Sequence, residues 1–347
     1  MNSQQRLESL DGVRGLAVLI VFLSHASGRE ISNVSWLNFH GIGHIGVYLF
    51  FVLSGYLLAR NLLSGQSAKE FYIRRFFRIA PLYFVVLLMV FAIQLNGYYS
   101  PRYLYVEDGG AGLFKHILFL KGDGVFWTVA AEFSFYLVLP LIVWVGVKFG
   151  SGWLMLGCVV YFSWFLFALQ GKLPPPKLVD IQHQGQFLDV LICGAIAAFI
   201  NRKLPEGVMA VLLAILMGIT VICVSKSFLW FHQPFYGLRW GSLLYGAVFA
   251  LSIVSVVQGN RYLLVVFNNP VLRFMGIVGF GWYLLHFQVF QIVNAYIEPG
   301  FVRFVLATIA TAACSWLAFV LIESPAIRLG KIISTKVSHR GQGVATI

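Results

Sequence analysis

The chain has 347 residues, of which 59% are hydrophobic and only 11% are charged, and its net charge is +12. A soluble domain of this length could not bury so much apolar side chain, so the composition excludes a soluble globular protein. The long apolar runs do not alternate with polar residues as the strands of an outer-membrane barrel do. We therefore predict an all-α fold, a polytopic bundle of transmembrane helices.

The basic excess is typical of the cytoplasmic loops of membrane proteins, and a cluster of arginines between spans could also hold a phosphorylated ligand. We expect no nucleic-acid partner and no metal cofactor. Four cysteines lie inside apolar runs, which favours small apolar packing residues over a disulfide framework. They are Cys158, Cys193, Cys223 and Cys314.

A helix needs about 20 residues to cross about 30 Å of hydrocarbon. By this measure the chain holds about ten candidate spans. They lie near residues 10–28, 44–63, 80–96, 126–147, 152–170, 186–201, 206–224, 240–257, 272–295 and 300–323.

The distribution of basic residues predicts the orientation of these spans. If the N-terminus is cytoplasmic, sixteen of the 25 Lys and Arg residues face the cytoplasm and nine face the other side. This bias predicts that both termini lie in the cytoplasm. We divide the chain into a transmembrane domain, 1–327, and a basic cytoplasmic tail, 328–347, which we expect to lie on the inner membrane surface against its lipids.

The first predicted helix, 10–28, carries Arg14 and His25, which are eleven residues apart. Eleven residues turn a helix by about 1100°, so the two side chains share one face, about 16 Å apart along the axis. Ionisable groups at such depth usually face a bundle interior or a wet cavity. Two alternatives remain: both side chains could snorkel to opposite interfaces, or the segment could be a signal peptide whose cleavage removes His25.

Four titratable residues are expected at a similar depth in the outer half of the membrane: His25, Glu132, Asp189 and His286. If they surround one cavity, a histidine supported by a carboxylate is a plausible general base. Each of the four could instead make a hydrogen bond between helices.

A second cluster, Arg74, Arg75 and Arg78, precedes the predicted span 80–96. Arg74 and Arg78 are four residues apart and would share a helical face. Guanidinium groups suit phosphate binding. Contact with lipid headgroups, or ordinary positive-inside charge, is the alternative.

Six motifs together resemble the acyltransferase-3 family of integral membrane O-acyltransferases. In chain order they are "LDGVRGLAVLIVFLSHA", "VYLFFVLSGYLLAR", "FYIRRFFRIAPLY", "FWTVAAEFSFYLVLPL", "GWYLLHFQVF" and "ESP". The departure is in the fourth motif, where Phe133 and Ser134 follow Glu132 in place of acidic or amide residues, leaving Glu132 as the only carboxylate there.

The resemblance implies transfer of an acyl group, by default acetyl, from cytoplasmic acyl-CoA to a hydroxyl of a glycan. The acceptors that it suggests are lipopolysaccharide O-antigen, exopolysaccharide, peptidoglycan or another lipid-linked sugar, at the bacterial inner membrane. We assign catalysis to His25 and Glu132, coenzyme A binding to Arg14, Arg74, Arg75 and Arg78, and substrate binding to Trp127, Tyr136, Asp189 and His286. Direct transfer and an acyl-histidine intermediate both remain open.

Two other classes of function compete with an enzyme. A proton-coupled transporter or flippase could use the same buried His and Glu residues as a proton relay. It would favour an internal repeat with broken helices, and the sequence shows no clear sign of either. A purely structural membrane subunit would have no need of buried charges.

Overall fold

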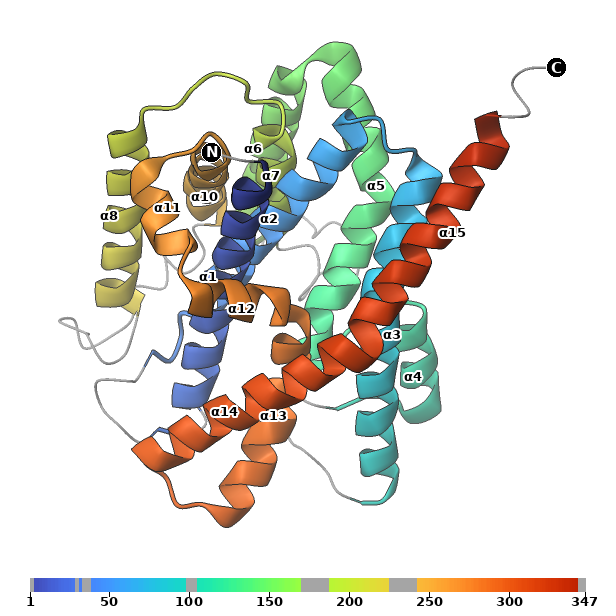
Figure 1. The fold of residues 1–347 in the computed structure, drawn as a ribbon, viewed down its shortest axis with the longest axis vertical. Helices are drawn as coiled ribbons and strands as arrows, with labels where there is room; N and C mark the ends of the chain where they lie inside the picture. Colours follow the sequence, from blue (N-terminus) through green and yellow to red (C-terminus); the bar gives the residue numbers. More distant parts are fainter. Residues whose placement is uncertain are drawn as a thin grey trace.

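The computed structural model describes residues 3–28, 31–32, 39–97, 105–169, 187–224 and 242–342 of the chain, and in these ranges its regular structure is helical throughout (Figure 1). The α-helices are α1 (Ser3–Gly28), α2 (Gly43–Leu63), α3 (Ala68–Leu95), α4 (Gly109–Ile117), α5 (Trp127–Phe149), α6 (Ser151–Leu169), α7 (Leu188–Ala197), α8 (Glu206–Val224), α10 (Ser242–Val257), α11 (Arg261–Phe267), α12 (Pro270–Ile277), α13 (Gly279–Tyr296), α14 (Phe301–Ala318) and α15 (Ser324–Gln342). The all-α prediction is confirmed for these residues.

The protein is an integral membrane protein by the length and apolar character of its helices. Five helical segments in the described ranges can cross a membrane, and seven can if each of two bent helix pairs counts as one span. The sequence predicts about ten. The difference comes partly from α7, which covers ten residues of the predicted span 186–201 and is too short to cross alone.

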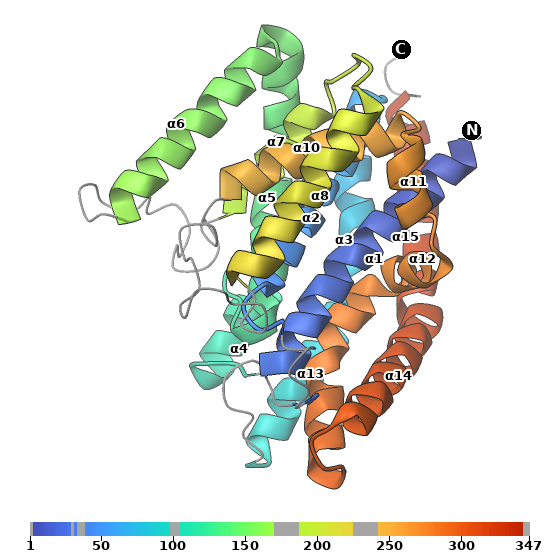
Figure 2. The same ribbon diagram turned by 90° about the vertical axis from the view of Figure 1, so that its left-hand side faces the viewer.

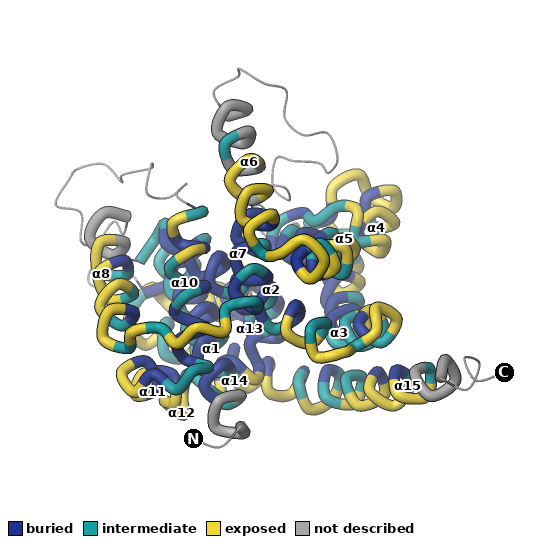
Figure 3. Tube along the Cα trace, turned by 90° about the horizontal axis from the view of Figure 1, so that it is seen from above, coloured by how far each residue is buried: buried dark blue, intermediate teal, exposed yellow. Residues whose placement is uncertain are grey.

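Helix α1 packs closely against both α2 and α12 (Figure 2). A β-carbon at Gly15 of α1 would overlap the carbonyl oxygen of Leu272 in α12, and one at Gly276 would overlap the carbonyl oxygen of Asp11. Only glycine allows the two backbones to approach this closely. In Figure 3 the buried residues are concentrated along α1, α2, α7 and α10, and the exposed residues lie at the rim.

One predicted span, 272–295, is broken rather than continuous, because α12 and α13 meet at 82°. The predicted span 240–257 is one helix, α10, and the next helix, α11, leaves it at 96°. The side chains of Asn260 and Asn269 accept backbone N–H groups at the starts of α11 and α12, so each of these two helices has an N-terminal cap. The described residues therefore contain two bent helix pairs, of which the sequence shows no clear sign.

Helix α3 begins twelve residues before the predicted span at residue 80. Ser67 and Glu70 form a capping box, in which each side chain accepts a hydrogen bond from the other residue's backbone. The arginine cluster that follows is consequently inside the helix, where its side chains take fixed directions around the axis. Pro81 lies within the same helix.

The C-terminal segment continues the last span. Helix α14 passes through a π-helical turn, Phe319–Glu323, into α15, and the three form one long diagonal rod in Figure 1. Helix α15 packs along α3, where Gly330 lies against Phe77. The boundary predicted at 327/328 falls inside α15, so the helix continues across it. Helix α6, in contrast, projects from the bundle (Figure 2).

The short helix α4 lies beside α3 at the end of the bundle opposite the α2–α3 turn (Figure 1). His116 of α4 is fully buried: its Nδ1 lies 2.9 Å from the Gly112 carbonyl, and its Nε2 accepts the backbone N–H of Asp123. Burial lowers the pKa of His116. This histidine therefore holds the loop after α4 in place as a neutral ring.

Candidate functional site

His25 of α1 and His286 of α13 form a hydrogen-bonded pair, which we call the histidine pair. His25 Nδ1 lies 2.9 Å from His286 Nε2, the ring planes are parallel, and the ring centroids are 5.1 Å apart. His286 is 1% exposed and is surrounded by aromatic rings, those of Phe22, Phe287 and Phe290. Two of the four titratable residues predicted to meet thus do meet, in apolar surroundings.

The other edge of His25 faces the start of α2. A β-carbon built on Gly43 would lie 3.7 Å from His25 Nε2 and 3.1 Å from Ser24 Oγ. The hydroxyl of Ser24 accepts the backbone N–H of Gly41 in the turn before α2, which fixes this approach. The absence of a side chain at position 43 leaves space beside Nε2.

Glu132 is not part of the histidine pair. It is 5% exposed, and it accepts a hydrogen bond of 2.7 Å from the hydroxyl of Ser54 in α2. Ser54 follows Gly43 by eleven residues, which is about 16 Å along the helix. The structure therefore places Glu132 apart from His25, an offset that helix positions alone did not reveal.

Glu132 instead borders a cavity with about 880 Å³ of empty space, which we call the arginine cavity. Arg14 of α1 and Arg75 and Arg78 of α3 line it, together with Ser54 and Tyr136. Arg14 makes an ion pair of 2.6 Å with Asp11, one turn earlier in α1. The cavity thus presents three guanidinium groups from two helices, with a carboxylate at its border.

Arg74 points elsewhere. Its Nε donates a hydrogen bond of 2.9 Å to the hydroxyl of Ser334 in α15, and its guanidinium lies 4.0 Å from Glu70. The two arginines of α3 that line the cavity are Arg75 and Arg78, and Arg74 does not line it. Packing of α15 against α3 decides which face of the arginine cluster is turned inward.

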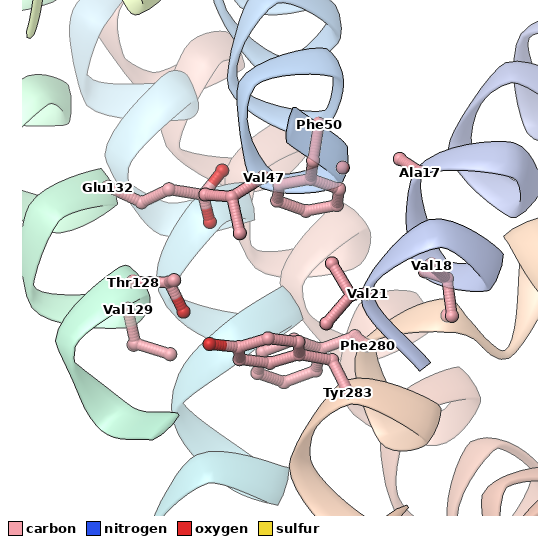
Figure 4. A pocket seen from close by; sticks show the side chains of 12 residues that line it. Ala17, Val18, Val21, Val47, Phe50, Thr128, Val129, Glu132, Phe280 and Tyr283 are labelled. Atoms are coloured by element: carbon pink, nitrogen blue, oxygen red, sulfur yellow. The ribbon is translucent and has the colours of Figure 1, made fainter. Parts of the chain in front are cut away.

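A second, apolar cavity adjoins the arginine cavity, with about 450 Å³ of empty space (Figure 4). The two share Phe50, Glu132 and Phe280 as lining residues. In the figure, side chains of α1, α2, α5 and α13 converge on this space, and the hydroxyls of Tyr283 and Thr128 face each other. We call it the apolar passage.

The far end of the apolar passage approaches the histidine pair. Its lining includes Val21, which is one helical turn before His25, and Tyr283, which is one turn before His286. It also includes Gly46, one turn after Gly43. The arginine cavity, the apolar passage and the histidine pair therefore follow one another between the same helices.

The remaining predicted site residues are divided between this site and its surroundings. Tyr136 lines the arginine cavity. Trp127 packs against Phe51 and Phe187, with ring centroids 6.1 and 5.0 Å apart. Asp189 accepts a hydrogen bond of 2.6 Å from Ser242, which joins α7 to α10, and it lines neither cavity. The depth argument correctly placed Asp189 in the interior but not at the site.

Ser54, Phe280 and Tyr283 are among the lining residues that sequence reasoning missed. All three lie within or next to the quoted motifs "VYLFFVLSGYLLAR" and "GWYLLHFQVF". For Tyr283 the available signal was its position three residues before His286, since residues three or four apart share a helix face.

The arginine cavity and the histidine pair are both built from helices that carry the six motifs. The chain belongs to the acyltransferase-3 family, whose model is described as an acyltransferase domain and matches residues 7–320. The resemblance stated from the sequence is confirmed.

Similar proteins include three from bacteria. The chain is 29% identical over 369 residues to the peptidoglycan O-acetyltransferase OatA of Listeria monocytogenes, covering 95% of this chain and 57% of that protein. It is 26% identical to the putative peptidoglycan O-acetyltransferase YrhL of Bacillus subtilis, covering 92% and 54%, and 24% identical to a putative O-acetyltransferase of Staphylococcus aureus, covering 85% and 52%. The chain thus spans a little over half the length of these relatives. No solved structure matches it.

Proposed function

We propose that the protein is an O-acetyltransferase of the bacterial inner membrane, which transfers an acetyl group from acetyl-CoA to a hydroxyl of a cell-surface glycan. The observation that carries the proposal is the order of the arginine cavity, the apolar passage and the histidine pair along the same helices. Family membership and the printed names of the relatives support the reaction class.

In this proposal the phosphates of coenzyme A bind in the arginine cavity, where Arg75 and Arg78 offer charge-assisted hydrogen bonds. The thioester end enters the apolar passage toward His25. The pantetheine arm that carries the thioester has no charge, so it suits a passage lined by valine and phenylalanine side chains. Arg14, about 16 Å from His25 along α1, belongs to the donor end.

His25 acts as the general base. Its Nε2 takes the proton of the acceptor hydroxyl while the hydroxyl oxygen attacks the thioester carbonyl carbon. When the C–S bond breaks, the proton on His25 passes to the leaving thiolate, so the products are the acetyl ester and coenzyme A, and the histidine returns to its neutral state. Direct transfer needs no second nucleophile.

The acceptor class that the relatives favour is peptidoglycan, because two of their names specify it. Lipopolysaccharide O-antigen and exopolysaccharide are the other acceptors within the proposal. The donor's cytoplasmic origin is part of the same proposal and follows from the basic bias of the segments around α3.

A transporter or flippase is the second candidate, favoured by the two broken helix pairs, since transporters place binding sites at such breaks. It predicts no chemical change in acetyl-CoA. The two functions therefore separate in a single assay.

The test uses purified membranes, acetyl-CoA labelled in the acetyl group, and peptidoglycan, O-antigen or exopolysaccharide as acceptor. We expect label in an alkali-labile ester on one glycan, and His25→Ala should lower the rate about 100- to 10,000-fold while acetyl-CoA still binds. Intact acetyl-CoA with every acceptor would favour the transporter. Near-normal transfer by the His25→Ala protein would overturn the catalytic assignment.

A further inference from the structure

His286 has hydrogen-bond contacts on both ring nitrogens, and these contacts decide where its proton sits. Its Nδ1 lies 2.7 Å from the carbonyl oxygen of Tyr283 and 3.1 Å from that of Trp282. A carbonyl oxygen can only accept a hydrogen bond, so the proton of His286 is on Nδ1. The Nε2 of a neutral His286 is therefore an acceptor.

The proton position on His25 follows from the same reasoning. Because His286 Nε2 accepts, the 2.9 Å contact requires His25 Nδ1 to donate. The lone pair of a neutral His25 is then on Nε2, at the ring edge that faces Gly43 and the end of the passage. That is the nitrogen which the proposed reaction needs as its base.

We propose that His286 is a positioning residue, which fixes the tautomer and orientation of His25 and stabilises its protonated form during transfer. This rests on the proposed function and deepens it. The role is the one that a buried carboxylate has in many histidine-dependent enzymes, but here a second imidazole performs it, held by two backbone carbonyls of α13.

The surroundings strengthen this hydrogen-bond chain. His286 is 1% exposed and enclosed by phenylalanines, so water does not compete for its Nε2. The parallel ring planes and the 5.1 Å centroid separation place the bonded nitrogens on facing edges of the two rings. When His25 gains a proton on Nε2, its Nδ1–H still donates to His286, so no proton has to leave the pair.

The test compares His286→Gln with His286→Phe. The amide oxygen of Gln can accept from His25 Nδ1–H, whereas Phe fills the space and accepts nothing. We expect the Phe variant to lose about 100- to 10,000-fold in kcat, with KM for acetyl-CoA nearly unchanged, and the Gln variant to recover at least a tenth of wild-type kcat. The His25→Ala/His286→Phe double variant should be no slower than His25→Ala, because the two residues act as a unit.

Equal losses in the Gln and Phe variants, additive losses in the double variant, or near-normal kcat in the Phe variant would each overturn the proposal. Size exclusion and acetyl-CoA binding report folding, and His286→Leu replaces the Phe variant if that protein does not fold. If wild type transfers acetyl and His25→Ala does not, the proposed function stands whatever His286 does. If wild type transfers nothing, the proposed function itself fails.

Discussion

Neighbouring arginines of α3 have different surroundings although they are adjacent in the sequence. Arg75 and Arg78 line the arginine cavity, while Arg74 donates to Ser334 of α15. One residue step turns a helix by about 100°, which is enough to move a side chain from an interior cavity to a helix–helix contact. Substitutions of Arg74 and Arg75 therefore compare the loss of the same side chain outside and inside the arginine cavity.

Arg75→Ala and Arg78→Ala should each weaken acetyl-CoA binding, and Arg74→Ala should leave it nearly unchanged. Each lost charge-assisted contact costs about 1.5–3 kcal/mol, which is about a 10- to 150-fold rise in Kd. Isothermal titration of the detergent-solubilised proteins measures it. Lysine at these positions should restore only part of the affinity, since it lacks the planar guanidinium group that can donate two parallel hydrogen bonds. A larger loss of acetyl-CoA affinity for Arg74→Ala than for Arg75→Ala would contradict this site and favour a donor site on the helix face that carries Arg74 and Arg78.

Individual residues also show where sequence reasoning succeeds and where it stops. Arg14 and His25 were placed on one face because a single helix has fixed geometry, and both lie toward the site. To predict the contact between His25 and His286, one has to know how α13 is oriented about its own axis. The depth of a residue in the membrane does not give this orientation. Glu132 is separated from the histidine pair by depth instead, since its partner Ser54 lies eleven residues after Gly43 in α2.

At the scale of elements, the hydropathy of a segment does not record a break within it. Residues 270–296 are mostly apolar, yet they form two helices at 82°. The local signals were present, with Asn269 and Pro270 starting α12 and Gly276 and Gly279 near the bend. What the sequence could not supply was the backbone of α1, against which this bend packs.

The close packing of α1 on α12 predicts a large effect from a small substitution. Gly15→Ala places a β-carbon on the Leu272 carbonyl, so α12 must move, at a cost of about 1–3 kcal/mol. We expect a lower thermal unfolding midpoint in detergent, measured by size exclusion after heating. The control is Gly152→Ala in α6, where nothing lies within 4 Å of the new β-carbon; there alanine should be neutral or stabilising by about 0.5–1 kcal/mol. Equal midpoints for the two variants would contradict the packing.

At the scale of the whole molecule, the site requires the two ends of the bundle to face different compartments. The arginine cavity is lined by the last turns of α2 and the first turns of α3, on either side of the α2–α3 turn, whereas the histidine pair lies beside the start of α2. Sixteen of 25 basic residues lie on the side of the α2–α3 turn in the predicted topology. The positive-inside bias predicts that this end faces the cytoplasm, the compartment from which the proposed donor, acetyl-CoA, would come.

Cysteine labelling tests this orientation. In a background without the four native cysteines, Ala68→Cys at the start of α3 should react with a membrane-impermeant maleimide only after the cells are opened. Gly110→Cys in α4 should react in intact cells, because it is exposed at the opposite end of the bundle. Both positions are exposed, so a difference between them reports the compartment and not the burial of the thiol. Labelling of Ala68→Cys in intact cells would place the arginine cavity outside, away from cytoplasmic acetyl-CoA, and the proposed direction of transfer would then be wrong.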